Sequence, residues 1–180
     1  MSELKKCDKS KMTLSIHKPA LALRDAFLRM VDDYAIHDPT RYQHARQDFA
    51  AYVQGLDDDE RGLVGIVPHS HRWLVSPAEI VVAVVRVRHH INTELLVNEF
   101  GHIGYDVAPS FRGRGYGVAA LRAGLAHAAE LGLERVLLYA DTDNPASWRT
   151  VERCGRVLAA EQYSAYYQCL VRRYWIKVVK

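Results

Sequence analysis

The chain has 180 residues, of which 49% are hydrophobic and 25% are charged, proportions typical of one compact globular domain. Lysine and arginine outnumber aspartate and glutamate by 24 to 21, yet residues 19–161 carry 15 basic against 19 acidic groups, a balance of −4. A nucleic-acid-binding domain needs a basic surface across its folded body, so this class is disfavoured.

The positive charge lies at the two ends of the chain. Residues 1–18 carry five lysines against two acidic residues, and we expect a basic, mobile segment there, followed by a single domain over residues 19–180. The chain contains no apolar window of signal-peptide or membrane-span length. The three cysteines, Cys7, Cys154 and Cys169, include no CxxC pair and predict neither a disulfide framework nor a zinc knuckle. These features favour a cytoplasmic protein without a membrane partner.

The first third of the chain has a helical pattern. Apolar residues return at helical spacing over 21–36, and a second helix is expected over 42–53, stopped by Gly55. We expect the acidic run 57–60 to be a loop, either solvated or facing a substrate.

Strands are expected next, over 71–75, 80–88 and 99–107, where β-branched residues gather. A glycine-rich turn, an amphipathic helix ending at Gly132 and a continuous apolar strand over 135–140 follow. Strand, turn, helix and strand together predict a βαβ unit.

The turn of this unit is PSFRGRGYG, residues 109–117. Unpaired amides at a helix start, glycines that permit close approach and two arginines are suited to binding a diphosphate. A Walker A loop is excluded because no Lys-Ser/Thr follows Gly117, and a dinucleotide fold is disfavoured because only 63 residues remain after it.

The sequence RGRGYG at residues 112–117 resembles motif A of the GNAT superfamily of acetyl-CoA-dependent N-acetyltransferases. Asn144, in the sequence NPAS, and Gly155 resemble motif B of that superfamily, and the strings GHIGY and RYWI resemble a bacterial branch known mostly as predicted acetyltransferases. The resemblance covers residues 19–176. It implies an α/β (α+β) GNAT fold, in which helices flank a central mixed V-shaped β-sheet that is splayed between strands 99–107 and 135–139.

The resemblance also implies how acetyl-CoA would bind as co-substrate. Its pantetheine arm would lie between the splayed strands, and the amide of Val107 would polarise the thioester carbonyl. Asn144 would position the pantetheine, although Asn144 before Pro145 is also a good helix N-cap. The expected pyrophosphate-binding residues are Arg112, Gly113, Arg114, Gly115, Tyr116 and Gly117.

Direct transfer to an amine needs a proton acceptor, for which Glu99 and His102 are the candidates. His102 could equally be a structural histidine bonded to Arg88 or His89. The family's usual tyrosine acid, seven residues after the Asn, is replaced by Val151, so Ser147 is the candidate group near the departing sulfur. A nucleophilic Cys154 and a metal site formed by His89, His90 and His102 are disfavoured, and no metal is expected.

The function expected is N-acetylation of a small-molecule amine. Residues 25–60 contain nine acidic residues against three arginines, which would attract a cationic acceptor unless they form a solvated helix surface. Acetylation of a protein N-terminus or lysine, and a non-catalytic acyl-CoA sensor, remain open. A shared edge strand over residues 176–179 would give a homodimer.

Overall fold

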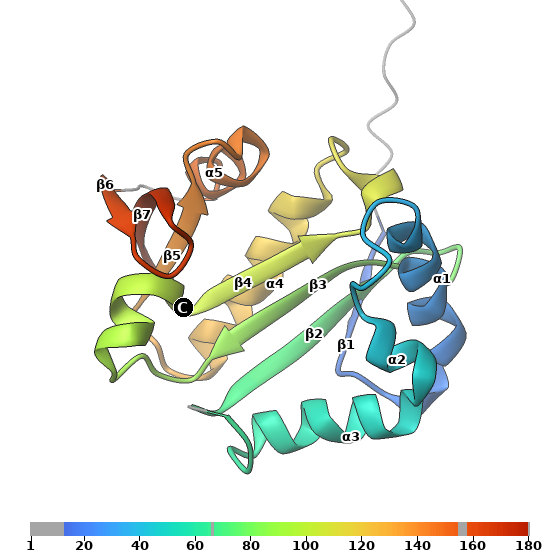
Figure 1. Cartoon of the computed structure of the whole chain (residues 1–180). Helices are drawn as coiled ribbons and strands as arrows, with labels where there is room; N and C mark the ends of the chain where they lie inside the picture. Colours follow the sequence, from blue (N-terminus) through green and yellow to red (C-terminus); the bar gives the residue numbers. More distant parts are fainter. Residues whose placement is uncertain (1–12, 66, 155–157, 180) are drawn as a thin grey trace, which may run out of the picture.

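The computed structural model describes residues 13–65, 67–154 and 158–179, and Figure 1 shows their arrangement. The helices are η1 (Leu21–Leu23), α1 (Arg24–Ala35), α2 (Gln43–Gln47), α3 (Phe49–Glu60), η2 (Leu96–Phe100), η3 (Pro109–Phe111), α4 (Tyr116–Glu130) and α5 (Pro145–Glu152). The strands are β1 (Ser15–His17), β2 (His69–Val75), β3 (Val81–Arg88), β4 (Ile103–Val107), β5 (Arg135–Asp141), β6 (Leu158–Ser164) and β7 (Cys169–Lys177).

The strands form two antiparallel sheets instead of one continuous mixed sheet. The first has the order β1-β2-β3-β4 and the second the order β5-β7-β6. Strands β4 and β5, joined through α4, meet near their starts and then diverge, as Figure 1 shows. The expected V shape is therefore present, and its opening lies between the ends of β4 and β5.

His102 links the two sheets at the point where they separate. Its amide donates to the carbonyl of Leu137 at 2.7 Å, and its Nδ1 accepts from the amide of Leu137 at 2.9 Å. Gly101 precedes it with φ +63°, and a Cβ there would lie 2.3 Å from the Leu137 carbonyl oxygen. Only glycine fits this close approach of the two strands.

Helices cover both faces of the first sheet (Figure 1). Helix α4 packs on one face, where Val85, Val87 and Ile103 join a core that continues into the second sheet. Helices α1–α3 pack on the other face around Trp73, which stacks on Phe27 with ring centroids 4.3 Å apart. Because side chains alternate along β4, this strand presents residues to both layers.

The helical expectations for residues 21–60 need two corrections. The helix expected over 42–53 is divided at Asp48, whose carboxylate accepts from the amide of Ala51 at 2.9 Å and so caps α3. Gly55 does not stop the helix, because the buried residues Phe49 and Leu56 hold α3 against the sheet on both sides of it. The run 57–60 is consequently the last turn of α3 and not a loop.

The strand expected over 99–107 begins only at Ile103. Residues Leu96–Phe100 form a π-helical turn that Gly101 ends, so Glu99 is helical. The extended pattern did not reveal this turn because its buried residue, Leu96, precedes the apparent strand.

The chain ends are also placed differently. Ser15–His17 pairs with β2, so the expected mobile segment does not include these residues, while residues 1–12 lie outside the described part. Ile176 and Lys177 belong to the central strand of the second sheet and pair with Val136 and Arg135. They are not a free edge for a second copy of the chain.

Candidate active site

A cavity of about 540 Å³ opens between the diverging strands. The lining comes from β4, the following loop, the start of α4, and α5. The lining residues are Tyr105, Asp106, Val107, Arg112, Gly113, Gly115, Gly117, Val118, Asn144, Ala146, Ser147, Arg149, Thr150 and Arg153.

The loop before α4 places unpaired amides at this cavity. Gly113 and Gly115 have φ of +72° and +89°, and Gly115 is the N-cap of the 15-residue helix α4. The first amide that bonds back into the helix is that of Ala119, which donates to the carbonyl of Gly115 at 3.2 Å. The preceding amides, together with the positive end of the helix dipole, can receive an anion.

The outer edge of β4 offers further backbone groups. Amides of Arg88 and Ala108 donate across the β3–β4 pair to His102 and Val82, which sets the alternation of that ladder. In an antiparallel pair, hydrogen-bonded and non-hydrogen-bonded residues alternate, and Tyr105 and Val107 are non-hydrogen-bonded positions of β4. Their N–H groups therefore point away from β3 into the gap. An extended ligand could bond to them as an added strand would.

The end of β4 is held by side chains of α1 and of the loop that follows the strand. The carbonyl of Val107 accepts from Tyr34 Oη and from Arg112 Nε, both at 3.1 Å. Asp33 accepts from the amide of Ser110 at 2.8 Å and from its hydroxyl at 2.5 Å. Helix α1 thereby fixes both the strand end and the turn that leads to the glycine loop.

Helix α5 supplies the opposite wall. Asn144 caps it by accepting from the amide of Ser147 at 3.1 Å, with Pro145 at the first helical position. Tyr105 Oη lies 3.3 Å from Ser147 Oγ and 3.2 Å from its carbonyl oxygen. Burial raises the pKa of Tyr105, so its phenol remains a proton donor near neutral pH. Val151 is 1% exposed and faces the core.

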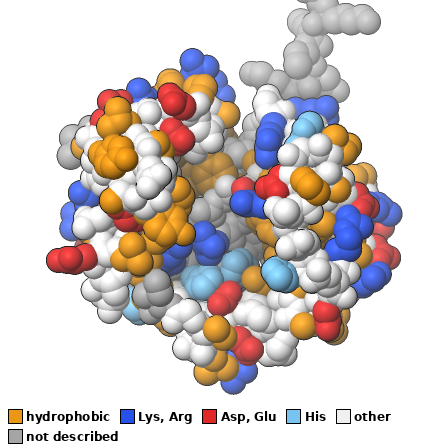
Figure 2. Space-filling view, viewed as in Figure 1, with side chains coloured by type: hydrophobic (Ala, Val, Ile, Leu, Met, Phe, Trp, Pro, Cys, Tyr) orange, Lys and Arg blue, Asp and Glu red, His pale blue; other side chains and the backbone are white. Residues whose placement is uncertain are grey.

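A second cavity, of about 450 Å³, adjoins the first and shares Tyr105 and Asp106 with it. Figure 2 shows a hollow in this face of the molecule, with basic (Lys or Arg) and histidine side chains along it. The other lining residues are Arg41, Tyr42, Tyr52, His71, Trp73, Val84, Val85, Arg86, Gly104 and Tyr167. Two arginines and one histidine against one aspartate do not match the expected acidic wall.

Asp106 stands where the two cavities meet. Its Oδ2 accepts from Tyr42 Oη at 2.7 Å and forms an ion pair with Arg41. Burial is the main cause that raises the pKa of Tyr42 well above its ordinary value, followed by the neighbouring Asp106 charge. The phenol is therefore protonated and can only donate to this carboxylate near neutral pH.

Sequence reasoning did not identify Asp106, Tyr105, Arg149 or Arg153. The four-residue spacing of Arg149 and Arg153 on a helix after the Asn-Pro cap was a usable signal, because it puts both on one face. No local signal marks Asp106, since its partners come from residues more than sixty positions away.

The structure brings together seven of the expected cofactor residues: Val107, Arg112, Gly113, Gly115, Gly117, Asn144 and Ser147. Arg114 and Tyr116 do not line the cavity, and both lie against the ring of Phe111. Cys154 is also outside it, and burial raises the pKa of its thiol, which disfavours a nucleophilic thiolate.

Neither expected proton acceptor lines either cavity. The Glu99 carboxylate accepts from the hydroxyl of Ser164 and from the amide of Ala165, so it holds the β6–β7 turn. His102 is 6% exposed, and burial lowers its pKa to about 4. Its ring nitrogen Nδ1 is occupied by the amide of Leu137.

Among the described residues, the side chains that lie close enough to share a metal ion are Asp59, His69 and His71, not the three histidines considered from the sequence. Asp59 Oδ2 lies 3.2 Å from His69 Nε2 and 3.7 Å from His71 Nε2. The structure holds these groups as a carboxylate between two imidazoles. Burial lowers the pKa of His71, which keeps this ring neutral at neutral pH.

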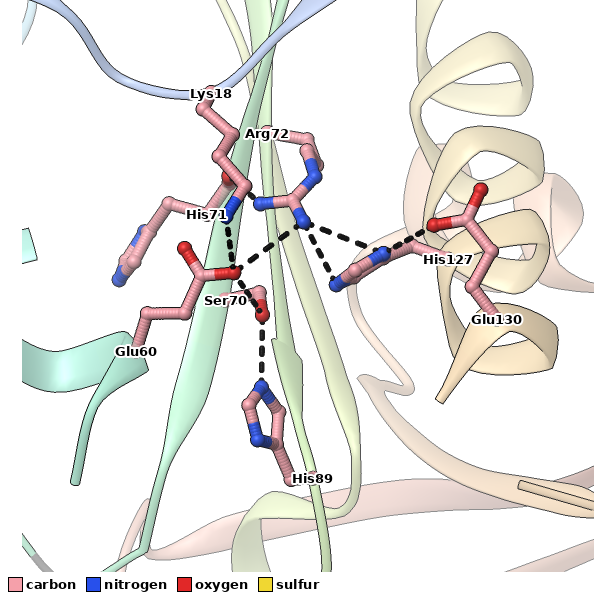
Figure 3. A network of polar contacts seen from close by, with 8 residues as sticks. All are labelled: Lys18, Glu60, Ser70, His71, Arg72, His89, His127 and Glu130. Atoms are coloured by element: carbon pink, nitrogen blue, oxygen red, sulfur yellow. Dashed lines mark hydrogen bonds and ion pairs between the residues drawn. The ribbon is translucent and has the colours of Figure 1, made fainter. Parts of the chain in front are cut away.

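Figure 3 shows how the start of β2 is fixed beside that cluster. Glu60, the last residue of α3, accepts from Lys18 and Ser70 at 3.0 Å and from Arg72 at 3.4 Å. Arg72 also lies 3.0 Å from Nε2 of His127 on α4, and the hydroxyl of Ser70 lies 2.8 Å from His89 Nε2. Glu60 and His89 are therefore hydrogen-bonded within this network, and neither residue lines either cavity.

A divided sheet with a glycine loop, a free strand edge and a capping α5 defines an acyl-CoA-dependent transferase architecture. A family model for an acetyltransferase (GNAT) domain matches residues 14–157. The chain belongs to the GNAT acetyltransferase family. Within the described residues, no helix is long and apolar enough to cross a membrane.

Individual relatives extend this finding. A mycothiol acetyltransferase from Mycobacteroides abscessus is 51% identical over 53 residues, which is 29% of this chain and only 18% of that relative. The Salmonella typhimurium acetyltransferase that modifies the N-terminal serine of ribosomal protein L7/L12 has 19% identity and a TM-score of 0.65, covering 94% of this chain and 97% of its own. The microcin C7 self-immunity acetyltransferase, solved with acetyl-CoA and AMP, has 16% identity, 92% coverage of both chains and a TM-score of 0.64.

Proposed function

We propose that the protein transfers an acetyl group from acetyl-CoA to a primary amine of a small molecule, directly, in a ternary complex. The observation that carries the proposal is the junction of two cavities at Tyr105 and Asp106, one lined by the amide-rich loop and the other by aromatic and basic side chains. A solved structure of the same fold contains acetyl-CoA, which supports this co-substrate.

The first cavity accounts for coenzyme binding. Its loop amides and Arg112 hold the pyrophosphate, and Arg149 and Arg153 on α5 supply charge for further phosphate. The pantetheine arm bonds to the free N–H groups of Tyr105 and Val107. The Val107 amide then polarises the thioester carbonyl and stabilises the oxyanion formed on it.

The second cavity holds the acceptor. Its amine, as the free base, attacks the thioester carbon from the Asp106 side, and the C–S bond breaks as the new C–N bond forms. The amine proton passes to Asp106 or to water bound on it, which takes the role first considered for Glu99 and His102. The departing thiolate receives a proton from Tyr105 Oη, with Ser147 orienting that hydroxyl. Solvent then returns a proton to the Tyr105 phenolate and takes up the proton held by Asp106, so that both groups return to their starting states.

Acetyl-CoA binding is the first test. Calorimetric titration is expected to show one site, and the double variant Arg112→Ala with Gly115→Asp is expected to weaken it at least tenfold. The aspartate would strain a residue at φ +89° and place a negative charge beside the pyrophosphate. An exposed variant, Arg61→Ala, is the control. Unchanged affinity in the double variant would overturn the assigned coenzyme site.

Acceptor-dependent release of CoA thiol over a panel of amines is the second test. Release with small amines supports the proposal, and release only with peptides supports acetylation of a protein N-terminus or lysine, the activity named for the ribosomal-protein relative. Tight acetyl-CoA binding without release by any acceptor would instead indicate an acyl-CoA sensor. The enclosure of the second cavity by Tyr42 and Tyr52 on one side and Tyr167 on the other favours small acceptors.

A further inference from the structure

We propose that Arg86 binds a carboxylate of the acceptor, so that the acetylated molecule is a short amino acid and not a simple amine or polyamine. This inference rests on the proposed function, because it names the acceptor class of the same site. It also replaces the cationic acceptor expected from the acidic composition of residues 25–60.

Arg86 occupies an unusual place for a charged side chain. It lies on β3, an inner strand with β2 and β4 on either side, and its neighbours Val85 and Val87 are 1% and 0% exposed. Arg86 itself is exposed, and it lines the acceptor cavity. A charge on the inner part of a sheet needs a polar partner or access to solvent, and here the cavity provides that access.

Gly104 gives the guanidinium its room. The two residues are paired across the β3–β4 ladder, and a Cβ on Gly104 would lie 3.3 Å from Arg86 Nη2. With hydrogen in that place, the guanidinium extends over β4 towards the acceptor cavity. A side chain at position 104 would crowd the guanidinium, so the glycine leaves it the space that it occupies.

The guanidinium of Arg86 has no partner inside the described part of the chain, where it makes no hydrogen bond or ion pair. The cavity's other arginine, Arg41, is paired with Asp106. Asp59 is near enough for the Arg86 charge to help lower its pKa, but this carboxylate already lies between two imidazoles. The donors of Arg86 are therefore available to a ligand.

The neighbouring positive charge of Arg88 also favours an anion at Arg86. Arg88 lies two residues further along β3, where it donates to the carbonyl of Gly101 at 3.0 Å. Its pKa is lowered to about 10, first by burial and then by the Arg86 charge, so the two guanidinium groups repel each other. A carboxylate at Arg86 would relieve this repulsion and accept two parallel hydrogen bonds from the guanidinium fork.

The positions fit one molecule. Gly104, which faces Arg86, precedes Asp106 by two residues, or about 7 Å at the rise of a β-strand. Arg86 and Asp106 therefore stand at neighbouring positions of one strand pair, where a single small molecule can reach both. The aromatic lining, Tyr42, Tyr52, Trp73 and Tyr167, accommodates an apolar or aromatic side chain.

The experiment compares amino acids with the amines that lack only their carboxylate, such as tyrosine with tyramine and lysine with cadaverine. Thiol release is measured at saturating acetyl-CoA. The amino acid is expected to have at least a tenfold higher kcat/KM, mainly through KM, and Arg86→Gln is expected to reduce this ratio to near one. Arg86→Lys should retain part of the preference, and Arg61→Gln, at an exposed site paired with Asp57, should retain all of it.

A binding measurement separates this inference from the proposed function. With CoA present, N-acetyl amino acids are titrated against their uncharged amides into wild type and Arg86→Gln. At least tenfold tighter binding of the carboxylates, lost in the variant, supports the inference even if no amine is turned over. Equal binding of both forms, or a preference that survives in Arg86→Gln, overturns it, while acetylation of the simple amines in the same panel would leave the proposed transferase standing.

Discussion

At the scale of single residues, Tyr105 links the two halves of the site. Its backbone N–H faces the gap between the sheets, while its hydroxyl reaches Ser147 on α5. The position where the family usually has a tyrosine acid holds Val151, which is buried in the core. We therefore propose that the phenol of Tyr105 on β4 takes the role of the tyrosine that α5 does not carry.

Tyr105→Phe tests this assignment. The variant keeps the ring that packs near Gly117 and removes the hydroxyl, so acetyl-CoA affinity is expected to stay within threefold of wild type. The rate of transfer is expected to fall about 10- to 100-fold. This loss is at or below the lower end of the range usual for general acid catalysis, because a CoA thiolate leaves readily without full protonation. The decisive measurement is kcat by thiol release. A full rate in this variant, with Ser147→Ala as comparison, would exclude the phenol as proton donor.

His102 makes the stability of the fold depend on pH. Its pKa is lowered from 6.5 to about 4, mainly by burial, so the unfolded chain binds this proton at a higher pH than the folded protein does. The stabilisation is present above about pH 6.5 and is lost as the pH falls through 4, by about 3 kcal/mol in total.

Urea unfolding of wild type and His102→Gln at pH 7.5, 6, 5 and 4.5 measures this contribution. The variant is expected to be less stable at pH 7.5, because Leu137 loses its acceptor, and to lose less stability on acidification. Parallel curves for the two proteins would show that His102 does not titrate in this window.

At the scale of elements, α4 determines how the coenzyme site is built. Its N-terminus presents the loop amides, and its body lies close enough to the first sheet that Gly124 has no room for a side chain. A Cβ on Gly124 would lie 2.9 Å from Val85 Cγ2 and 3.2 Å from Ile103 Cγ2. Since Ile103 begins β4, the helix and the cofactor-binding strand are positioned against each other by this contact.

Substitution of two helical glycines by alanine separates packing from helix propensity. Gly124→Ala is expected to destabilise the protein by about 1 to 3 kcal/mol, because the added methyl overpacks the interface. Gly55→Ala in α3, where nothing lies within 4 Å of the added Cβ, is expected to stabilise it by about 0.5 to 1 kcal/mol. Chemical denaturation of both variants gives the comparison. Stabilisation by Gly124→Ala would contradict the close contact between α4 and β3.

At the scale of the whole molecule, the division of the sheet creates the active site. The four-stranded and three-stranded sheets are joined beside His102, and both sheets contribute buried side chains to the same hydrophobic core. Beyond that junction, the polar edge of β4 is left without a strand partner, an arrangement that favours a bound ligand. In the proposed complex, the coenzyme would complete the sheet as well as supply the acetyl group.

Amide hydrogen exchange with and without acetyl-CoA tests this role of the ligand. The amides of Tyr105 and Val107 are expected to exchange at least tenfold more slowly in the complex, together with those of residues 113–118. Amides in the β2–β3 ladder should change little, since they are already paired. At a hundredfold excess over its Kd, acetyl-CoA should also stabilise the fold by about 2.7 kcal/mol. Protection limited to the loop would show that β4 does not bind the pantetheine arm.

The sequence alone predicted the local structure of the loop and the helix start that line the first cavity. A helix start with glycines at positive φ, an adjacent arginine and an Asn-Pro cap are local requirements, and local residues satisfy them at 112–117 and 144–147. The spacing of apolar residues similarly predicted α4, which buries one helix face, and β5, which is a largely buried apolar strand. The limits of α3 and β4 were missed, because tertiary burial of Leu56 and the turn at Gly101 outweigh the local pattern.

Only the tertiary structure decided the second cavity, which we propose as the acceptor site. Arg41, His71, Arg86, Asp106 and Tyr167 come from five separate segments, and each is unremarkable in its own sequence context. The acidic composition of residues 25–60 suggested a cationic acceptor, but folding pairs these carboxylates with Arg46, Ser110, His69 and Arg72, among others. Net charge in a sequence counts all groups equally, whereas a binding site is formed by the few charges that folding leaves without a partner.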